Sequence, residues 1–307
     1  MTNLAIILCT YNGQKFLKEQ LDSYLWQDFR DWSLFVYDDR SRDSTADIVN
    51  GFAAEAVNNK IEFSVNKEPQ GFARNFMQAI KNTPNDFEFY ALSDQDDVWQ
   101  KQKLSRATSK LKKFPEDIPA LYCARTITVD VKLQYMGLSP LFSRKPSFEN
   151  ALVQSLAGGN TMVLNKAAKK LLDSVSEDID IVSHDWFIYQ LISGAGGNIY
   201  YDEVPSLLYR QHGSNLVGSN NGIFAKLLRV GKLLKGSFKK WNDRNVKALF
   251  DNIDLLSKES ALKLAAFNKM RNCDMPFRLI NFIKLGLYRQ SIGGQIGLIV
   301  GIILGKI

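Results

Sequence analysis

Three aspartates in four positions directly follow an apolar segment of the chain. The segment is Phe87–Leu92, and the acids lie within Ser93-Asp94-Gln95-Asp96-Asp97. An apolar run of this length predicts a buried strand that carries the acids at its carboxyl end. Carboxylates this close repel one another and are costly to bury, so a divalent cation would neutralise them. The alternative is a solvated turn in which Asp and Ser side chains cap a helix.

Two earlier apolar segments end at polar turns in the same way. Leu4–Cys9 precedes Thr10-Tyr11-Asn12-Gly13, and Trp32–Tyr37 precedes an acidic turn over 38–44. A segment with helical periodicity follows each turn, which indicates repeated strand–turn–helix units. Open parallel sheets bind nucleotides at the carboxyl ends of such strands. The chain is therefore predicted to be an α/β protein with a Rossmann-like, mostly parallel central sheet flanked by helices.

The middle of the chain continues the same alternation. Periodicity predicts strands over 61–65 and 120–129 and helices over 72–80, 99–114 and 186–192. Residues 130–150 show little periodicity and include Gly and Pro, so we expect a loop at the edge of the site.

Charge divides the chain into two regions. Residues 1–222 contain 23 Lys and Arg against 27 Asp and Glu, a net charge of −4, whereas residues 223–307 contain 16 against 5, a net charge of +11. We therefore expect an α/β domain over 1–222 and a helical basic and apolar region over 223–307. In the second region, apolar residues alternate with eight basic ones: Lys226, Arg229, Lys232, Lys235, Lys239, Lys240, Arg244 and Lys247. This pattern is typical of an amphipathic basic helix.

The final segment, Ser291–Ile307, contains one Lys, no acid and several apolar blocks. A basic cluster combined with an apolar anchor predicts peripheral attachment to the inner face of the cell membrane. The alternative is a helical bundle that packs on the first domain or on a second subunit, giving a homodimer. Nucleic acid explains the charge less well because the first region is net acidic. Three scattered cysteines and the absence of a basic N-terminal leader indicate a cytoplasmic protein.

The polar strings of residues 4–216, taken in order, resemble glycosyltransferase family 2. The strings are Thr10–Gly13, Asp38–Ser44, Gln70–Asn75, Ser93–Asp97, Gly158–Met162, His184–Trp186 and Arg210–Asn215. The amino-acid sequences of Ser93–Asp97 and Arg210–Asn215 are most similar to those of bacterial rhamnosyltransferases that act in surface-polysaccharide synthesis, such as that of O-antigen or capsule. The resemblance implies a GT-A fold and inverting, metal-dependent transfer of L-rhamnose from dTDP-rhamnose to a saccharide acceptor, one carried on a lipid.

Three other functions are alternatives to this one. The first is the same fold with a UDP-Gal, UDP-Glc or UDP-GlcNAc donor. The second is a nucleotidyltransferase, which would show a Gly-rich basic loop after the first strand, where this chain has Thr10–Gly13. The third, a non-catalytic membrane scaffold, would explain the tail alone.

The resemblance also implies which residues bind the nucleotide sugar. Tyr11 would stack on the base, Asp39 would accept a hydrogen bond from its imide nitrogen, and Thr10 would offer backbone contacts. The expected set is completed by Asn12, Asp38, Arg74, Asp94, Gln95 and Asp96. Asp38 would equally well brace its loop, and the alternative for Arg74 is a surface ion pair.

Asp94 and Asp96 are expected to hold Mn²⁺ or Mg²⁺, with Asp96 as the direct ligand. His212 would complete the metal shell or close over the diphosphate. Asp97 would either join this site or cap the helix that follows.

Asp185, at the predicted start of a helix, is expected to be the catalytic base. It matches the acid of the family's Glu-Asp motif, although His184 replaces the glutamate. Gly159 and Asn160 would let a sugar approach the backbone closely, and His184 and Trp186 are expected near the donor or acceptor sugar.

Overall fold

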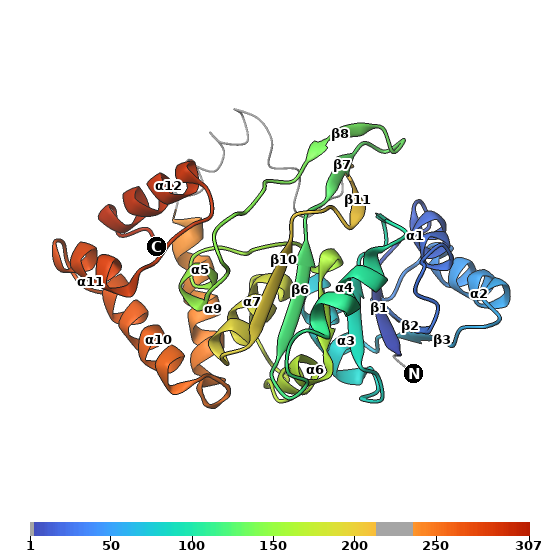
Figure 1. The fold of residues 1–307 in the computed structure, drawn as a ribbon, viewed down its shortest axis with the longest axis horizontal. Coiled ribbons are helices and arrows are strands. Elements are labelled where there is room, and N and C mark those ends of the chain that lie inside the picture. The colour runs from blue at the N-terminus through green and yellow to red at the C-terminus, as the bar shows by residue number, and fades with distance from the viewer. Residues whose placement is uncertain (1–2, 213–235) are drawn as a thin grey trace.

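The centre of the molecule is a seven-stranded sheet with strand order β10-β6-β9-β4-β1-β2-β3 (Figure 1). The computed structural model describes residues 3–212 and 236–307. The strands are β1 (Leu4–Thr10), β2 (Trp32–Asp38), β3 (Ile61–Val65), β4 (Phe89–Ser93), β6 (Ala120–Ala124), β9 (Val163–Asn165) and β10 (Asn198–Asp202). Pairing is parallel except at β9, which runs antiparallel to both β4 and β6. The mostly parallel sheet predicted from the sequence is confirmed.

Helices cover both faces of this sheet because β1 is apolar on both sides. Leu4, Ile6 and Leu8 face one core with α1 (Leu17–Leu25), α2 (Thr45–Glu55) and α4 (Lys103–Leu111). The alternating residues of β1 face a second core with α3 (Phe72–Asn82), α6 (Lys166–Asp173) and α7 (His184–Gly194). Burial on both faces is the arrangement expected for a strand inside a parallel sheet.

A smaller sheet, in the order β5-β11-β7-β8, lies beyond the carboxyl ends of the central strands. It consists of β5 (Val98–Trp99), β7 (Ile127–Val129), β8 (Tyr135–Leu138) and β11 (Leu207–Arg210). The single strand predicted over 120–129 is therefore wrong: the chain leaves β6 after Ala124 and joins the smaller sheet at Ile127. At this bend the Arg125 side chain donates to the Ser139 carbonyl at 2.6 Å.

The helix predicted over 99–114 begins later, at Lys103, because Val98–Trp99 pairs with β11. Likewise, the segment 130–150 is not a structureless loop. It contains β8, paired with β7, and the short helix α5 (Phe148–Ala151).

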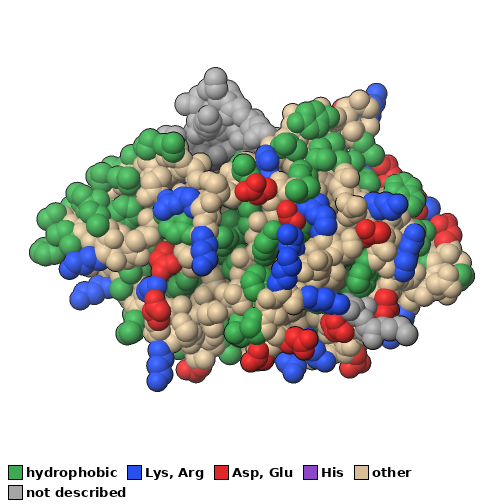
Figure 2. All heavy atoms as spheres, in the orientation of Figure 1, with side chains coloured by type: hydrophobic (Ala, Val, Ile, Leu, Met, Phe, Trp, Pro, Cys, Tyr) green, Lys and Arg blue, Asp and Glu red, His purple; other side chains and the backbone are tan. Residues whose placement is uncertain are grey.

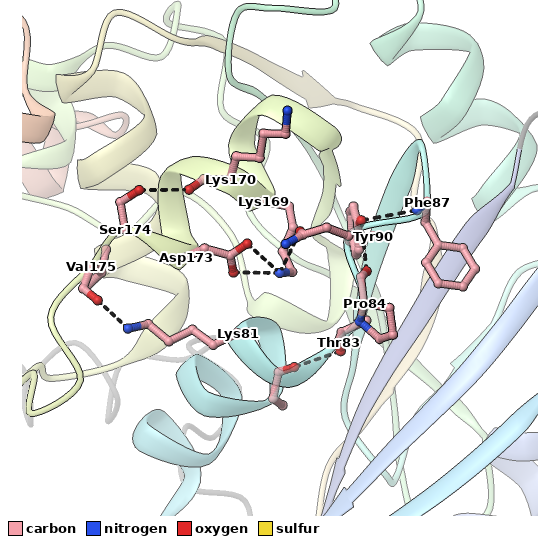
Figure 3. Close-up of polar contacts among 12 residues, drawn as sticks. Lys81, Thr83, Pro84, Phe87, Tyr90, Lys169, Lys170, Asp173, Ser174 and Val175 are labelled. Carbon is pink, nitrogen blue, oxygen red and sulfur yellow. Dashed lines mark hydrogen bonds and ion pairs between the residues drawn. The ribbon is translucent and has the colours of Figure 1, made fainter.

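The opposite end of β4 is fixed by polar contacts around a buried lysine (Figure 3). Lys169 of α6 lies 2.6 and 2.8 Å from the two carboxylate oxygens of Asp173, and it also donates to Asn85. Tyr90 of β4 donates to the Pro84 carbonyl at 3.1 Å. These contacts join α6 to the chain that enters β4. They lie near the amino end of β4, away from the acidic turn, so we infer that they stabilise the fold.

The described residues 236–307 form four α-helices at the end of the molecule beside α5 and α7 (Figure 1). They are α9 (Ser237–Phe250), α10 (Lys258–Arg271), α11 (Phe277–Leu285) and α12 (Ile292–Ile303), and the 3-10 turn η2 (Ile253–Leu255) lies between α9 and α10. A second 3-10 turn, η1 (Gly159–Thr161), precedes β9 in the central sheet. Leu249, Phe267 and Leu298 are buried in the same core as α7. In the part of the chain described, no helix is both long and apolar enough to cross a membrane.

The predicted basic helix can be compared with the structure only in part. Residues 224–235 and the expected domain boundary at 222 lie outside the described residues, while the last basic residues of the pattern belong to α9. Arg244 of α9 pairs with Asp180, and Lys247 pairs with Asp251.

Candidate active site

The carboxyl ends of β1, β2 and β4 lie side by side, as the sequence predicts. In the sheet register Thr10 is opposite Asp38, and Leu8 is opposite Ser93. The hydroxyl of Thr10 donates to Oδ1 of Asp38 at 2.7 Å. The three polar turns recognised in the sequence therefore meet at one edge of the sheet, where α/β proteins bind their ligands.

Gln95 of the acidic turn fixes the backbone of Tyr11. Its Oε1 accepts from Tyr11 N at 2.8 Å, and its Nε2 donates to Tyr11 O at 3.0 Å. A Cβ at Gly13 would lie 2.5 Å from the same Oε1, so a side chain there would displace the Gln95 amide from Tyr11. The Tyr11 side chain is 58% exposed. A fixed backbone with an exposed ring suits stacking on a planar ligand.

Asp38 and Asn12 brace the two loops against each other. Asp38 accepts from Ser41 N at 2.7 Å and from the Ser41 hydroxyl at 2.5 Å. Asn12, which has a positive φ of 48°, donates from its N–H to the Ser41 hydroxyl and accepts from Arg42 N at 2.9 Å. The Asp38 carboxylate thus braces its own loop, which is the alternative to donor contact that the sequence suggested.

The Asp39 carboxylate is held at the entrance to α3. Oδ1 accepts from Asn66 Nδ2 at 2.9 Å and from Gln70 N at 2.8 Å, and Oδ2 accepts from Gly71 N at 2.9 Å. Each carboxylate oxygen can accept more than one hydrogen bond, so Asp39 retains capacity for a ligand. Its orientation is set before any ligand arrives.

The acidic turn, the start of α7 and the end of β11 form one cluster. His212 Nε2 lies 2.8 Å from Asp96 Oδ2, and the His212 ring packs against Phe16 with centroids 5.0 Å apart. Burial, together with the charges of Asp96 and Asp185, raises the pKa of Asp94 to about 7. Asp94, Asp96, Asp185 and His212 are therefore brought together, as expected.

This cluster has the donor chemistry that a divalent cation requires. The partly buried, mutually repelling carboxyls of Asp94 and Asp96 would be stabilised in their ionised forms by a cation. The described residues contain no group of three His, Cys, Asp or Glu side chains arranged to hold a metal by themselves. Mg²⁺-like ions commonly use one or two carboxylates and take their remaining ligands from substrate phosphates and water. The residues present fit a cation of that kind.

Asp185 lies in the first turn of α7, where the sequence places it. Its Oδ1 accepts from the hydroxyl of Ser183 and from Trp186 N, the latter at 2.7 Å. These contacts orient the carboxylate and leave Oδ2 without a hydrogen-bond partner among the described residues. An oriented carboxylate at a helix N-terminus beside an acidic cluster is suited to accept a proton.

His184 is buried beneath this position. Its ring stacks on Phe76 with centroids 3.9 Å apart, and neither ring nitrogen has a hydrogen-bond partner within the described residues. Burial lowers the pKa of His184 to about 4, against an opposing effect of Asp185, so the ring is neutral at pH 7. A Cβ at Gly159 would lie 2.1 Å from its Nε2. Gly159 is thus required for packing against His184, a different role from the sugar approach expected for it.

Two expected site residues direct their polar atoms elsewhere. Arg74 pairs with Asp178 at 3.0 Å on the surface, which is the alternative weighed for it. The Trp186 indole donates to the Ala151 carbonyl at 2.7 Å and stacks near Phe238, so it joins α7 to α5 and α9. A tryptophan that is 5% exposed in this position stabilises the packing of α7.

Sequence reasoning missed a buried charge network under the acidic turn. Asp97 Oδ2 accepts from Asn160 Nδ2 at 2.6 Å, and Lys103 donates to the Asn160 carbonyl. The Lys103 ammonium lies 3.4 Å from the centroid of the Trp99 ring. Burial raises the pKa of Asp97 and lowers that of Lys103, while each charge opposes the shift of the other. Asp97 therefore neither caps α4 nor faces solvent; it anchors the acidic turn to Asn160.

Arg210, the first residue of the last polar string, was also overlooked. Its guanidinium donates to the Asp96 carbonyl at 3.0 Å, to the Val131 carbonyl at 2.9 Å and to the Glu19 carboxylate at 2.7 Å. It is 1% exposed and connects β11 with the acidic turn and α1. Its place two residues before His212 was the available signal. Gly213, Ser214 and Asn215 of the same string lie outside the described residues.

Comparison with known proteins adds independent information. The model of the family "Glycosyl transferase family 2" matches residues 5–172. The dTDP-rhamnosyl transferase RfbG of Shigella flexneri is 31% identical over 258 residues, which cover 80% of this chain and 85% of that protein. The Escherichia coli UDP-Glc:alpha-D-GlcNAc-diphosphoundecaprenol beta-1,3-glucosyltransferase WfgD is 30% identical over 110 residues, covering 36% of this chain and 41% of the relative.

Solved structures show the same fold at low sequence identity. Residues 1–349 of S. aureus TarS in complex with UDP align with a TM-score of 0.57 at 16% identity, covering 92% of this chain and 81% of that one. A mannosyltransferase from Pyrobaculum calidifontis in complex with GDP-Man and Mn²⁺ aligns with a TM-score of 0.51 at 15% identity, covering 99% and 85%. These likenesses support the GT-A-like fold.

Proposed function

This chain belongs to glycosyl transferase family 2, and on that premise we propose that it transfers L-rhamnose, with inversion, from dTDP-rhamnose to a lipid-linked saccharide of a cell-surface polysaccharide. The observation that carries this proposal is the convergence of Asp94, Asp96, Asp185 and His212 at the carboxyl edge of the sheet. The choice of donor is supported by the similarity to the S. flexneri dTDP-rhamnosyl transferase. A UDP-hexose donor is the second candidate, supported by the shorter match to the E. coli glucosyltransferase.

The first two turns bind the nucleotide in this proposal. The exposed ring of Tyr11 stacks on the base, and Asp39, held by Gln70 N and Gly71 N, accepts a hydrogen bond from the imide nitrogen. Thr10 and Asn12 shape the loop beneath the ribose, with Asp38 as their brace. Gln95 keeps the backbone of Tyr11 in register with the acidic turn.

Asp96 and Asp94, together with His212, would hold Mn²⁺ or Mg²⁺. When bound, such a cation supplies positive charge that stabilises the leaving diphosphate. Lys103 and Asn160 hold Asp97 in place beneath the acidic turn, so the turn would keep its shape as charge develops on the leaving diphosphate.

Asp185 serves as the base. Ser183 and Trp186 N hold its Oδ1, and the second oxygen takes the proton of the acceptor hydroxyl. As that proton moves to Asp185, the acceptor oxygen bonds to the anomeric carbon and the bond from that carbon to the diphosphate oxygen breaks. One attack from the face opposite the leaving group inverts the anomeric configuration. The products are the extended saccharide and the nucleoside diphosphate.

A lipid-linked acceptor places the enzyme at the cytoplasmic face of the membrane, which agrees with the +11 charge of residues 223–307. We therefore include peripheral membrane association in the proposal. The C-terminal helices would supply it, in preference to a homodimer contact.

A thermal-shift experiment on the full chain tests the donor. dTDP-rhamnose, UDP-Glc, UDP-Gal, UDP-GlcNAc and GDP-mannose are compared, each with Mn²⁺, with Mg²⁺ and with chelator. A ligand that binds only the native state raises the melting temperature, and the rise grows with the ratio of its concentration to its Kd. The proposal predicts the largest metal-dependent rise with dTDP-rhamnose. A larger rise with a UDP-sugar would favour the second candidate.

A further inference from the structure

Two C-terminal helices present large apolar side chains to solvent. The exposed fractions are 64, 45 and 70% for Phe277, Ile280 and Ile283 of α11, and 59, 40 and 44% for Ile296, Val300 and Ile303 of α12. We call these six side chains the apolar ridge. Figure 2 shows hydrophobic side chains gathered over α11 and α12 at one end of the molecule. Exposed apolar patches of this kind mark interaction sites in folded proteins.

The ridge is distinct from the faces that hold these helices in the fold. Phe282 of α11 and Leu298 and Ile302 of α12 are buried in the main core on the opposite sides of their helices. The ridge residues recur at spacings of three and four, so each helix has a second apolar stripe. Arg278 of α11 donates to the Ile302 carbonyl at 3.1 Å, which joins the two helices. Packing in the core therefore accounts for the apolar residues of the buried stripes, but it does not account for those of the exposed ridge.

The charge around the ridge identifies what covers it. Residues 275–307 contain four basic residues, Arg278, Lys284, Arg289 and Lys306, and no acidic one. Lys284 is exposed and follows Ile283 directly. The segment is net positive, although the exposed Asp274 directly precedes it, so an anionic surface would be attracted to it. A second copy placed symmetrically on the ridge would instead bring equal positive charges together, so self-association is disfavoured.

We propose that the apolar ridge inserts into the interface of an anionic lipid bilayer, with α11 and α12 lying in the membrane plane and the exposed Lys284 of α11 at the headgroups. The helices have 9 and 12 residues, too short to span a bilayer, whose hydrocarbon core needs about 20. Apolar insertion combined with electrostatic attraction is the pair of signals that stable peripheral binding requires. This inference deepens the proposed peripheral location and rests on it, but it does not depend on which sugar is transferred.

Vesicle co-sedimentation of the full chain tests the ridge. The vesicles contain phosphatidylglycerol and phosphatidylcholine, or phosphatidylcholine alone, and no donor or acceptor is present. The double variant Ile283→Asn/Ile296→Asn removes one apolar residue from each helix. Leu262→Asn is the matched control because Leu262 is 73% exposed on α10, outside the ridge. Circular dichroism and melting temperature verify that both variants fold, and light scattering gives their mass.

We expect the wild type and Leu262→Asn to bind the anionic vesicles equally and to bind less as salt rises, because salt screens surface charge. The double variant should bind at least tenfold more weakly with its melting temperature unchanged. Equal binding by the double variant, or no binding by the folded wild type, would overturn the inference. A wild-type dimer that the double variant dissociates would instead assign the ridge to self-association. Because no sugar transfer is measured, failure here is distinguishable from failure of the proposed activity.

Discussion

His212 Nε2 and Asp96 Oδ2 lie 2.8 Å apart although 116 positions separate them in the sequence. The contact joins the end of β11 to the acidic turn after β4. Arg210 reinforces it by donating to the Asp96 carbonyl and to Glu19. The residue after β11 is thereby placed where a diphosphate and its cation would bind.

His212→Gln tests this contact. Gln can still donate a hydrogen bond to Asp96, but it is a weaker metal ligand than imidazole. We expect the affinity for dTDP in the presence of Mn²⁺ to fall by about 10- to 100-fold, the range found when groups around a metal site are altered. Calorimetric titration measures it. Affinity in the presence of chelator should equal that of the wild type; an equal loss there would show that His212 acts on the nucleotide or on the fold.

Burial of His184 predicts a stability that depends on pH. Its pKa is lowered from 6.5 to about 4, so the unfolded chain binds the proton more readily between these values. Stability from this group is therefore present above pH 6.5 and is lost as the pH falls toward 4, by about 2 kcal/mol between pH 7 and 5. Urea unfolding of the wild type and His184→Gln at both values measures the difference. The variant should lose less stability on acidification, and parallel losses would contradict the assignment.

Gly159 should not tolerate a side chain, because a Cβ there would lie 2.1 Å from His184 Nε2. We expect Gly159→Ala to lower the free energy of unfolding by roughly 1–3 kcal/mol through overpacking. Turnover should fall as well, since displacement of His184 moves Asp185. Gly51→Ala in α2 is the control, as no atom lies within 4 Å of its Cβ position. That change should be neutral or stabilising by about 0.5–1 kcal/mol. Unfolding curves and initial rates of both variants decide the point.

Asp185→Asn should separate binding from chemistry. Asn keeps the size of the side chain but cannot take a proton from the acceptor. Donor affinity should stay within a few-fold of the wild type, while turnover falls by on the order of a hundredfold or more. Donor titration and single-turnover transfer measure the two quantities separately. Transfer at a near wild-type rate would mean that another residue is the base.

Much of the fold follows from local patterns. The apolar segments of β1, β2 and β4 end at polar turns, and parallel pairing brings such ends to one edge, so Thr10, Asp38 and the acidic turn could be placed together from sequence. Asp185 could be placed at the start of α7 because the segment that follows it has helical periodicity. The break between β6 and β7 could not, because Ala120–Val129 is continuous in β propensity and only pairing with β11 and β8 divides it.

Side-chain direction was the harder part of the site. Trp186 and Arg74 occupy positions of the family motifs. Tertiary packing nevertheless turns Trp186 toward α5, and Arg74 pairs with the exposed Asp178. Lys103 was overlooked because a lysine in a helix is normally solvated, whereas this one is fully buried beside Asn160 and Trp99. Only the assembled fold shows that Asp97 has a structural partner and that Asp96 faces His212.

In the proposed function, Asp96 anchors a metal-dependent donor site for dTDP-rhamnose. The most direct measurement is release of dTDP from dTDP-rhamnose by the full chain with Mn²⁺ and a lipid-linked saccharide acceptor, compared with Asp96→Ala. We expect release and matching saccharide extension for the wild type with metal, with neither above background after chelation or in the folded variant. Undiminished transfer by Asp96→Ala, or by the wild type in chelator, would contradict it.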